Sequence, residues 1–198
     1  MFDAFFGDHK MKIKSILATV ALVAIAIPVF ASIESGLKVG DRVTPFHPDH
    51  VSGPLAGSSN CFPCTFQNRP AVQVWVHGDD MKNIQAIAKE LKENMDGHKG
   101  KEFKAMIVMI ADNAKQMGEM KSMIAQHHGT KVDADGVAIA VIEKNNEALK
   151  AYKINLDSSV KNTVIIYKNW KVEKTFVNLK MDENGCGEFC KSVAAVTN

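Results

Sequence analysis

The sequence predicts an α/β fold in which helices flank a central mixed sheet. Two apolar runs, residues 71–76 and 103–111, are almost continuous, as in strands that are buried on both faces. Apolar residues recur at helical spacing after each of these runs. The expected order is β-α-β-α-β followed by β-β-α. Such alternation is typical of parallel βαβ units to which an antiparallel hairpin has been added.

Polar residues mark the expected ends of the elements. Asp79 or Asp80 can cap the first long helix, and Gly97 can end it. Three prolines in residues 44–55 leave room there for at most short edge strands. The remaining expected elements are a helix from Asp112 or Asn113 to Gly129, strands at 137–142, 163–167 and 172–177, and helices at 145–152 and 185–196.

Composition excludes some classes of function. The 198 residues are 46% hydrophobic with a formal net charge of +2, which fits one globular domain plus a processing segment. Nucleic-acid binding usually needs a basic face. Here the lysines are interleaved with acids, as in residues 89–104, which we interpret as solvated surface. We therefore expect no nucleic-acid partner.

The N-terminal residues have the layout of a secretory signal peptide. Met11–Lys14 is basic, residues 16–30 are apolar, and Ala31 suits a cleavage site. The apolar run of about 15 residues is short of the roughly 20 that span a bilayer, although an uncleaved anchor is the alternative. Residues 1–10 stand upstream of Met11, a second possible start. We expect a signal peptide at 1–31, an N-terminal extension with the CxxC loop at 32–70, and a core at 71–198.

Export implies a periplasmic or extracellular protein, with no membrane association after cleavage, and makes disulfides plausible. The four cysteines are Cys61, Cys64, Cys186 and Cys190, and they allow three pairings. The simplest joins neighbours, Cys61 with Cys64 and Cys186 with Cys190. The second pair would lie one helical turn apart, within reach of a strained disulfide. A stapling bond or a second redox pair could result there.

Several stretches resemble the thioredoxin-like superfamily. Residues 39–43, VGDRV, resemble the opening of exported redoxin-type proteins, and residues 163–175 resemble the late thioredoxin hairpin. Cys61-Phe-Pro-Cys64, followed by residues 68–72, is similar to a group of exported bacterial thioredoxin-like proteins. In that group a CxxC precedes the first core strand. The resemblance implies a thioredoxin-like fold with an N-terminal extension.

The sequence departs from the superfamily pattern at two positions. An active thioredoxin carries its cysteines just after the first core strand, but residues 77–82 contain none. A peroxiredoxin would place its reactive cysteine in the same region, so peroxiredoxin activity is not expected. Asn162 occupies the position of the usual cis-proline. The usual site is therefore expected to be lost.

The leading interpretation is thiol–disulfide exchange, or redox-linked binding, at Cys61 and Cys64. Pro63 would tighten the turn between the sulfurs, and Arg69 could supply the positive charge that lowers a thiol pKa. Residues 60–69 read as a loop, so a helix contribution is not assured. By analogy with the usual order of exposure, Cys61 would be the nucleophile and Cys64 the resolving thiol. Thiol- or disulfide-containing proteins would be the partners, no cofactor is expected, and whether the protein is an enzyme stays open.

Two alternatives belong to other classes. The first is a non-catalytic interaction or scaffold domain in which both cysteine pairs are structural staples. The second is a zinc-binding module, because His47 and His50 with Cys61 and Cys64 provide four good Zn²⁺ ligands at suitable internal spacing. Export favours oxidised cysteines over this second alternative.

Overall fold

A computed structural model of the chain describes residues 33–128 and 136–198. The predicted signal peptide lies outside these described residues, as does the predicted helix end at Gly129. Among the helices that the structure does describe, none is both long and apolar enough to cross a bilayer.

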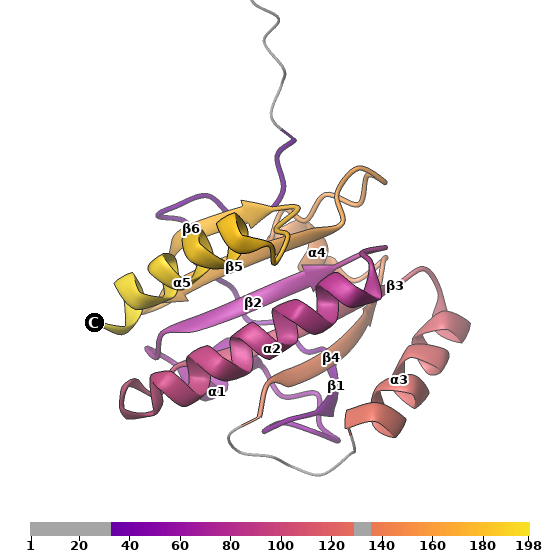
Figure 1. Cartoon of the computed structure of the whole chain (residues 1–198). Coiled ribbons are helices and arrows are strands. Elements are labelled where there is room, and N and C mark those ends of the chain that lie inside the picture. The colour runs from indigo at the N-terminus through magenta and orange to yellow at the C-terminus, as the bar shows by residue number, and fades with distance from the viewer. Residues whose placement is uncertain (1–32, 129–135) are drawn as a thin grey trace, which may run out of the picture. The chain divides into compact units, whose positions relative to one another are not determined.

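In the described residues, six strands form one mixed sheet (Figure 1). The mixed sheet and five of the strands are as the sequence predicted, and the sixth is a short edge strand of the kind it allowed. They lie in the order β1-β4-β3-β2-β5-β6, with parallel pairing of β2, β3 and β4 and antiparallel pairing elsewhere. The strands are β1 (Asp49–Ser52), β2 (Ala71–Val76), β3 (Lys104–Ala111), β4 (Ala138–Glu143), β5 (Asn162–Lys168) and β6 (Lys171–Val177). The short strand β1 at the sheet edge agrees with the prolines around it.

Helices cover both faces of the sheet. Figure 1 shows α2 and α5 in front of it and α1 and α4 behind. The helices are α1 (Phe62–Phe66), α2 (Met81–Gly97), the 3₁₀ turn η1 (Lys99–Lys101), α3 (Ala114–His128), α4 (Glu147–Ala151) and α5 (Glu183–Thr197). Asp80 caps α2 by accepting a hydrogen bond from the Lys82 amide at 2.9 Å, as the sequence predicted.

The alternation of side chains along β2 divides the core into two layers. Val72, Val74 and Val76 point into the front layer, which α2, α3 and α5 cover. Ala71 and Trp75 point into the back layer, which α1, α4 and the N-terminal extension cover. Each fully buried side chain of valine size or larger contributes about 1.5–3 kcal/mol, so β2 stabilises both layers at once.

A tight turn after β1 positions the residues that precede the cysteine pair. The His50 amide donates to the Ser58 carbonyl and the Gly57 amide donates to the His50 carbonyl, each at 2.9 Å. Gly53 opens this turn with φ +84°, and a Cβ there would lie 2.5 Å from the Val137 carbonyl oxygen. The turn can therefore pack against β4 only with glycine at position 53.

We predict that Gly53→Ala lowers the free energy of unfolding by about 2–5 kcal/mol, because a left-handed backbone costs about 1–2 kcal/mol and the clash adds about 1–3 kcal/mol. Gly57→Ala is the matched control, since φ there is +76° but no atom lies within 4 Å of the added Cβ. It should cost only about 1–2 kcal/mol. Urea unfolding of both variants measures the difference, and equal losses would contradict the packing argument.

Candidate functional site

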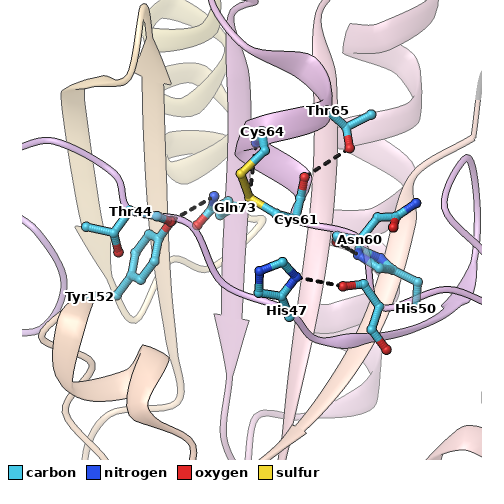
Figure 2. Close-up of a disulfide and its surroundings, with 10 residues drawn as sticks. Thr44, His47, His50, Asn60, Cys61, Cys64, Thr65, Gln73 and Tyr152 are labelled. Atoms are coloured by element: carbon cyan, nitrogen blue, oxygen red, sulfur yellow. Dashed lines mark hydrogen bonds between the residues drawn. A yellow bond between two sulfur atoms is a disulfide. The ribbon is translucent and has the colours of Figure 1, made fainter.

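Cys61 and Cys64 are joined by a disulfide, with their Cα atoms 5.2 Å apart (Figure 2). The expectation of a loop across residues 60–69 was wrong in part, because residues 62–66 form α1. Cys61 is the N-cap of this helix, and its Sγ accepts a hydrogen bond from the Cys64 amide at 3.2 Å. Pro63 fits the first turn, where a backbone N–H would have no helical acceptor.

Burial of one aromatic side chain makes this short helix form. Phe62 is fully buried in the back layer, and its ring packs edge-to-face against Phe66 with centroids 4.8 Å apart. Five residues are too few to show an amphipathic pattern, and so short a helix depends on tertiary packing. The sequence alone therefore could not distinguish α1 from a loop.

The two cysteines differ in exposure, and the order is opposite to the expected one. Cys61 is 5% exposed, whereas Cys64 is exposed at the surface. Residue 64 lies two positions after the buried Phe62, about 200° around the helix, so it faces outward. The assignment of Cys61 as nucleophile relied on the usual order of exposure, which this structure does not have. Cys64 is the more exposed residue of the pair.

The helix α1 lies beside the N-terminal ends of β2 and β3. The Arg69 guanidinium pairs with Glu102 at 2.9 Å, just before β3 begins. The Lys104 ammonium lies over the Phe66 ring, 5.4 Å from its centroid. Sites in parallel α/β sheets usually lie at the opposite, C-terminal, edge. These contacts place the C-terminal end of α1 at the N-terminal edge, while Asn60, just before Cys61, bonds to His50 within the sheet.

A hydrogen-bond network lies at the C-terminal end of β2, the position that the active site occupies in thioredoxins. Asn162 begins β5, pairs with Val76 and is 2% exposed. Its amide donates to the Asp79 carboxylate at 2.6 Å, and its Oδ1 accepts from the Leu179 amide at 2.9 Å. These contacts hold the β2–α2 connection against the end of β5. These hydrogen bonds explain why an asparagine occupies the position that a cis-proline holds in thioredoxins.

Two histidines brace the segment that leads into the disulfide (Figure 2). A ring nitrogen of His47 lies 3.0 Å from the Ser59 carbonyl oxygen, and Nε2 of His50 lies 2.9 Å from that of Asn60. A carbonyl only accepts hydrogen bonds, so Nε2 of His50 carries the proton. Burial lowers the pKa of His50, which keeps the ring neutral.

The zinc set considered from the sequence does not assemble. Cys61 and Cys64 are bonded to each other, and the imidazoles of His47 and His50 face backbone carbonyls. Within the described part of the chain, the potential ligand atoms that do converge belong to other residues.

A series of buried hydrogen bonds connects the N-terminal extension to β2 near the disulfide (Figure 2). Gln73, the one polar residue of β2, donates to the Tyr152 hydroxyl at 3.4 Å. That hydroxyl donates to the Thr44 carbonyl oxygen at 2.6 Å. Burial raises the pKa of Tyr152 to about 12, so the hydroxyl stays protonated and can donate. The polar interruption in residues 71–76 thus has a structural role.

Comparisons with solved structures identify the fold. No protein-family profile matches the sequence, and a comparison with curated protein sequences finds no match. A structure described as a candidate thiol:disulfide interchange protein DsbE of Chlorobium tepidum matches with a TM-score of 0.57 and 14% identity, over 82% of this chain and 99% of that one. The chain has a thioredoxin-like fold.

Two further structures support this result. An uncharacterized conserved protein of Geobacillus kaustophilus matches with a TM-score of 0.59 and 16% identity, over 83% of this chain and 85% of that one. A candidate protein disulfide isomerase of Bacteroides thetaiotaomicron matches with a TM-score of 0.57 and 8% identity, over 83% and 94%. The resemblance read from the sequence is confirmed at the level of the fold, with the CxxC ahead of β2, the first strand of the parallel core.

The second cysteine pair of this thioredoxin-like chain is not bonded as expected. Cys186 and Cys190 are free, half-buried thiols on α5. Their Sγ atoms donate to different oxygens of Glu90 on α2, at 3.2 Å and 2.9 Å. Hydrogen bonding to Glu90 raises the pKa of Cys186, and burial together with Glu90 raises the pKa of Cys190 to about 12. Both thiols are directed toward the Glu90 carboxylate and not toward each other, as a disulfide between them would require.

Sequence reasoning missed Glu90. It lies in residues 89–104, which we interpreted as solvated surface, but it is half-buried. Asn94, one turn later, is 9% exposed and donates to the Glu90 carboxylate at 2.8 Å. Both residues flank the apolar stripe that contains Leu91. The available sequence signal was a Glu and an Asn at i, i+4 beside this apolar stripe, a spacing that places both side chains on one face of the helix.

We predict that His50 makes the fold less stable as pH falls. Its folded-state pKa is below the unfolded value of 6.5, so the unfolded chain binds the proton more readily. The free energy of unfolding should therefore fall as pH drops from 6.5 toward the folded-state pKa. In His50→Gln this part of the slope should disappear, whereas the exposed-site control His47→Gln should keep it. Urea unfolding between about pH 5 and pH 7.5 measures the slope, and an unchanged slope in His50→Gln would refute the assignment.

Proposed function

We propose that this chain is an exported thiol–disulfide exchange protein whose reacting pair is Cys61 and Cys64. The observation that carries the proposal is the asymmetry of the disulfide. Cys64 is an exposed residue, while Cys61 is buried and its sulfur accepts a backbone hydrogen bond. The signal-peptide layout of residues 11–31 supports export.

The asymmetry suggests a direction of attack. A substrate thiolate would attack Sγ of Cys64 from solvent, and the electron pair of the S–S bond would move to Sγ of Cys61. The Cys64 amide, 3.2 Å from that sulfur, would stabilise the departing thiolate. The product is a mixed disulfide between the substrate and Cys64.

A second substrate thiolate completes the exchange. It attacks the substrate sulfur of the mixed disulfide, and Cys64 leaves as a thiolate. The substrate gains a disulfide, and the pair receives two electrons and two protons in total. The reverse sequence would reduce a substrate disulfide. Partners are thus proteins with accessible thiols or disulfides, in keeping with the candidate thiol:disulfide interchange protein and the candidate protein disulfide isomerase among the structural neighbours.

A structural staple is the second candidate. The location of α1 at the N-terminal ends of β2 and β3, away from the usual edge, favours it. A staple would have a reduction potential below about −300 mV and would resist the glutathione pool. A labile exchange pair would lie well above that value.

We predict that the two single serine variants behave differently. Cys61→Ser leaves the exposed Cys64 thiol without its resolving partner, so it should accumulate a stable mixed disulfide with oxidised glutathione. Cys64→Ser leaves a buried thiol and should react at least about tenfold more slowly, because access to the sulfur limits exchange. Mass spectrometry with thiol trapping follows both reactions.

The matched control is Cys186→Ser/Cys190→Ser, which keeps the reacting pair and should exchange as the wild type does. Turnover of reduced or scrambled ribonuclease, or of insulin, tests catalysis directly. Wild-type turnover that is absent, or that persists in both single variants, would remove the proposal. Faster mixed-disulfide formation by Cys64→Ser than by Cys61→Ser would instead reverse the assigned roles.

A further inference from the structure

A second group of reactive side chains lies where α2 packs against α5. Cys186 and Cys190 stand one turn apart on α5 and therefore share a face of that helix. Glu90 reaches them from α2. One ligand atom of each residue lies within 4.8 Å of the others, and all three side chains are half-buried. Ions could therefore reach the group from solvent.

The spacing suits a small thiophilic cation. Tetrahedral Zn²⁺ with Zn–S distances of about 2.3 Å and Zn–O of about 2.0 Å holds its ligand atoms roughly 3.3–3.8 Å apart. Here the Cys186 sulfur lies 3.2 Å from one Glu90 oxygen and the Cys190 sulfur lies 2.9 Å from the other, slightly closer than that range. An ion between the three atoms would replace the two hydrogen bonds to Glu90, and only small side-chain shifts would be needed.

The surroundings hold the three ligands in place. The Asn94 amide donates to a Glu90 oxygen at 2.8 Å and lies 3.7 Å from the Cys190 sulfur. A Cβ at residue 185 would lie 1.9 Å from the Lys180 carbonyl oxygen, so glycine there lets α5 begin close against the preceding loop. A hydrogen bond from a neighbouring side chain, such as that from Asn94 to Glu90, orients a metal ligand.

The charges nearby do not oppose a cation. Lys89 and Glu93 flank Glu90 on α2 and pair with each other at 3.6 Å. The thiols of Cys186 and Cys190 need not repel each other, because each loses its proton only when the cation takes its place.

We propose that Glu90, Cys186 and Cys190 form a binding site for Zn²⁺ that joins α2 to α5. Two thiolates and one carboxylate supply three ligands, and water completes the fourth position. Binding releases the two thiol protons, so affinity rises with pH. The site is separate from the Cys61–Cys64 disulfide and does not depend on the exchange function.

The test is a Zn²⁺ titration of the reduced full chain against a chromophoric chelator. The Cys61→Ser/Cys64→Ser variant should bind about one Zn²⁺ per chain, as the wild type does. Cys186→Ser/Cys190→Ser should lose that binding, and Glu90→Gln should weaken it by at least about tenfold. Co²⁺ in place of Zn²⁺ should give thiolate-to-metal charge-transfer absorption only when Cys186 and Cys190 are present.

A second measurement leaves the proposed ligands intact. In the Cys61→Ser/Cys64→Ser variant, Zn²⁺ should protect Cys186 and Cys190 from alkylation, which mass spectrometry can follow residue by residue. Alkylation at the same rate with and without Zn²⁺ would overturn the proposal. So would unchanged Zn²⁺ affinity in Cys186→Ser/Cys190→Ser, or its loss in Cys61→Ser/Cys64→Ser.

Discussion

The burial of β2 on both faces is the constraint on which the rest of the structure depends. β2 pairs with β3 on one side and β5 on the other, and all six of its residues are buried. Its valines require a front layer and its Trp75 requires a back layer. Each face would expose apolar surface without its cover, so the helices and the N-terminal extension are needed together.

The back layer explains why the cysteine pair lies where it does. Phe62 is buried against that layer and fixes α1 beside the N-terminal ends of the parallel strands. The same anchor directs Cys61 inward and Cys64 outward. At the opposite edge, the Asn162 side chain donates to the Asp79 carboxylate and to the Leu179 carbonyl oxygen, and it accepts from the Leu179 amide. The sheet thus has a thioredoxin-like architecture, while the Cys61–Cys64 disulfide belongs to a helix that precedes β2 and does not follow it.

The two cysteine pairs show how neighbouring groups decide the state of a thiol. In the turn around Pro63, Cys61 and Cys64 face each other and form a disulfide. On α5, a carboxylate from another helix stands against both sulfurs, and the thiols bond to it instead. Similar spacing in sequence therefore leads to a disulfide at one pair and to two free thiols at the other.

Local patterns in the chain were enough to predict the mixed α/β sheet and five of its strands, because the apolar runs and helical periodicities reflect short-range geometry. For residues 44–55 they allowed only short edge strands, and β1 is one such strand. The same patterns located the CxxC ahead of β2 and Asn162 at the start of β5, because both positions follow from the order of the elements along the chain. The sequence did not predict helix α1, the outward direction of Cys64 or the contacts of Glu90. Each depends on contacts with residues far away in the chain, such as the packing of Phe62 on the sheet or the approach of α5 to α2. Only the folded chain brings those partners together, so only the tertiary structure could show which sulfur is accessible and which carboxylate faces a thiol.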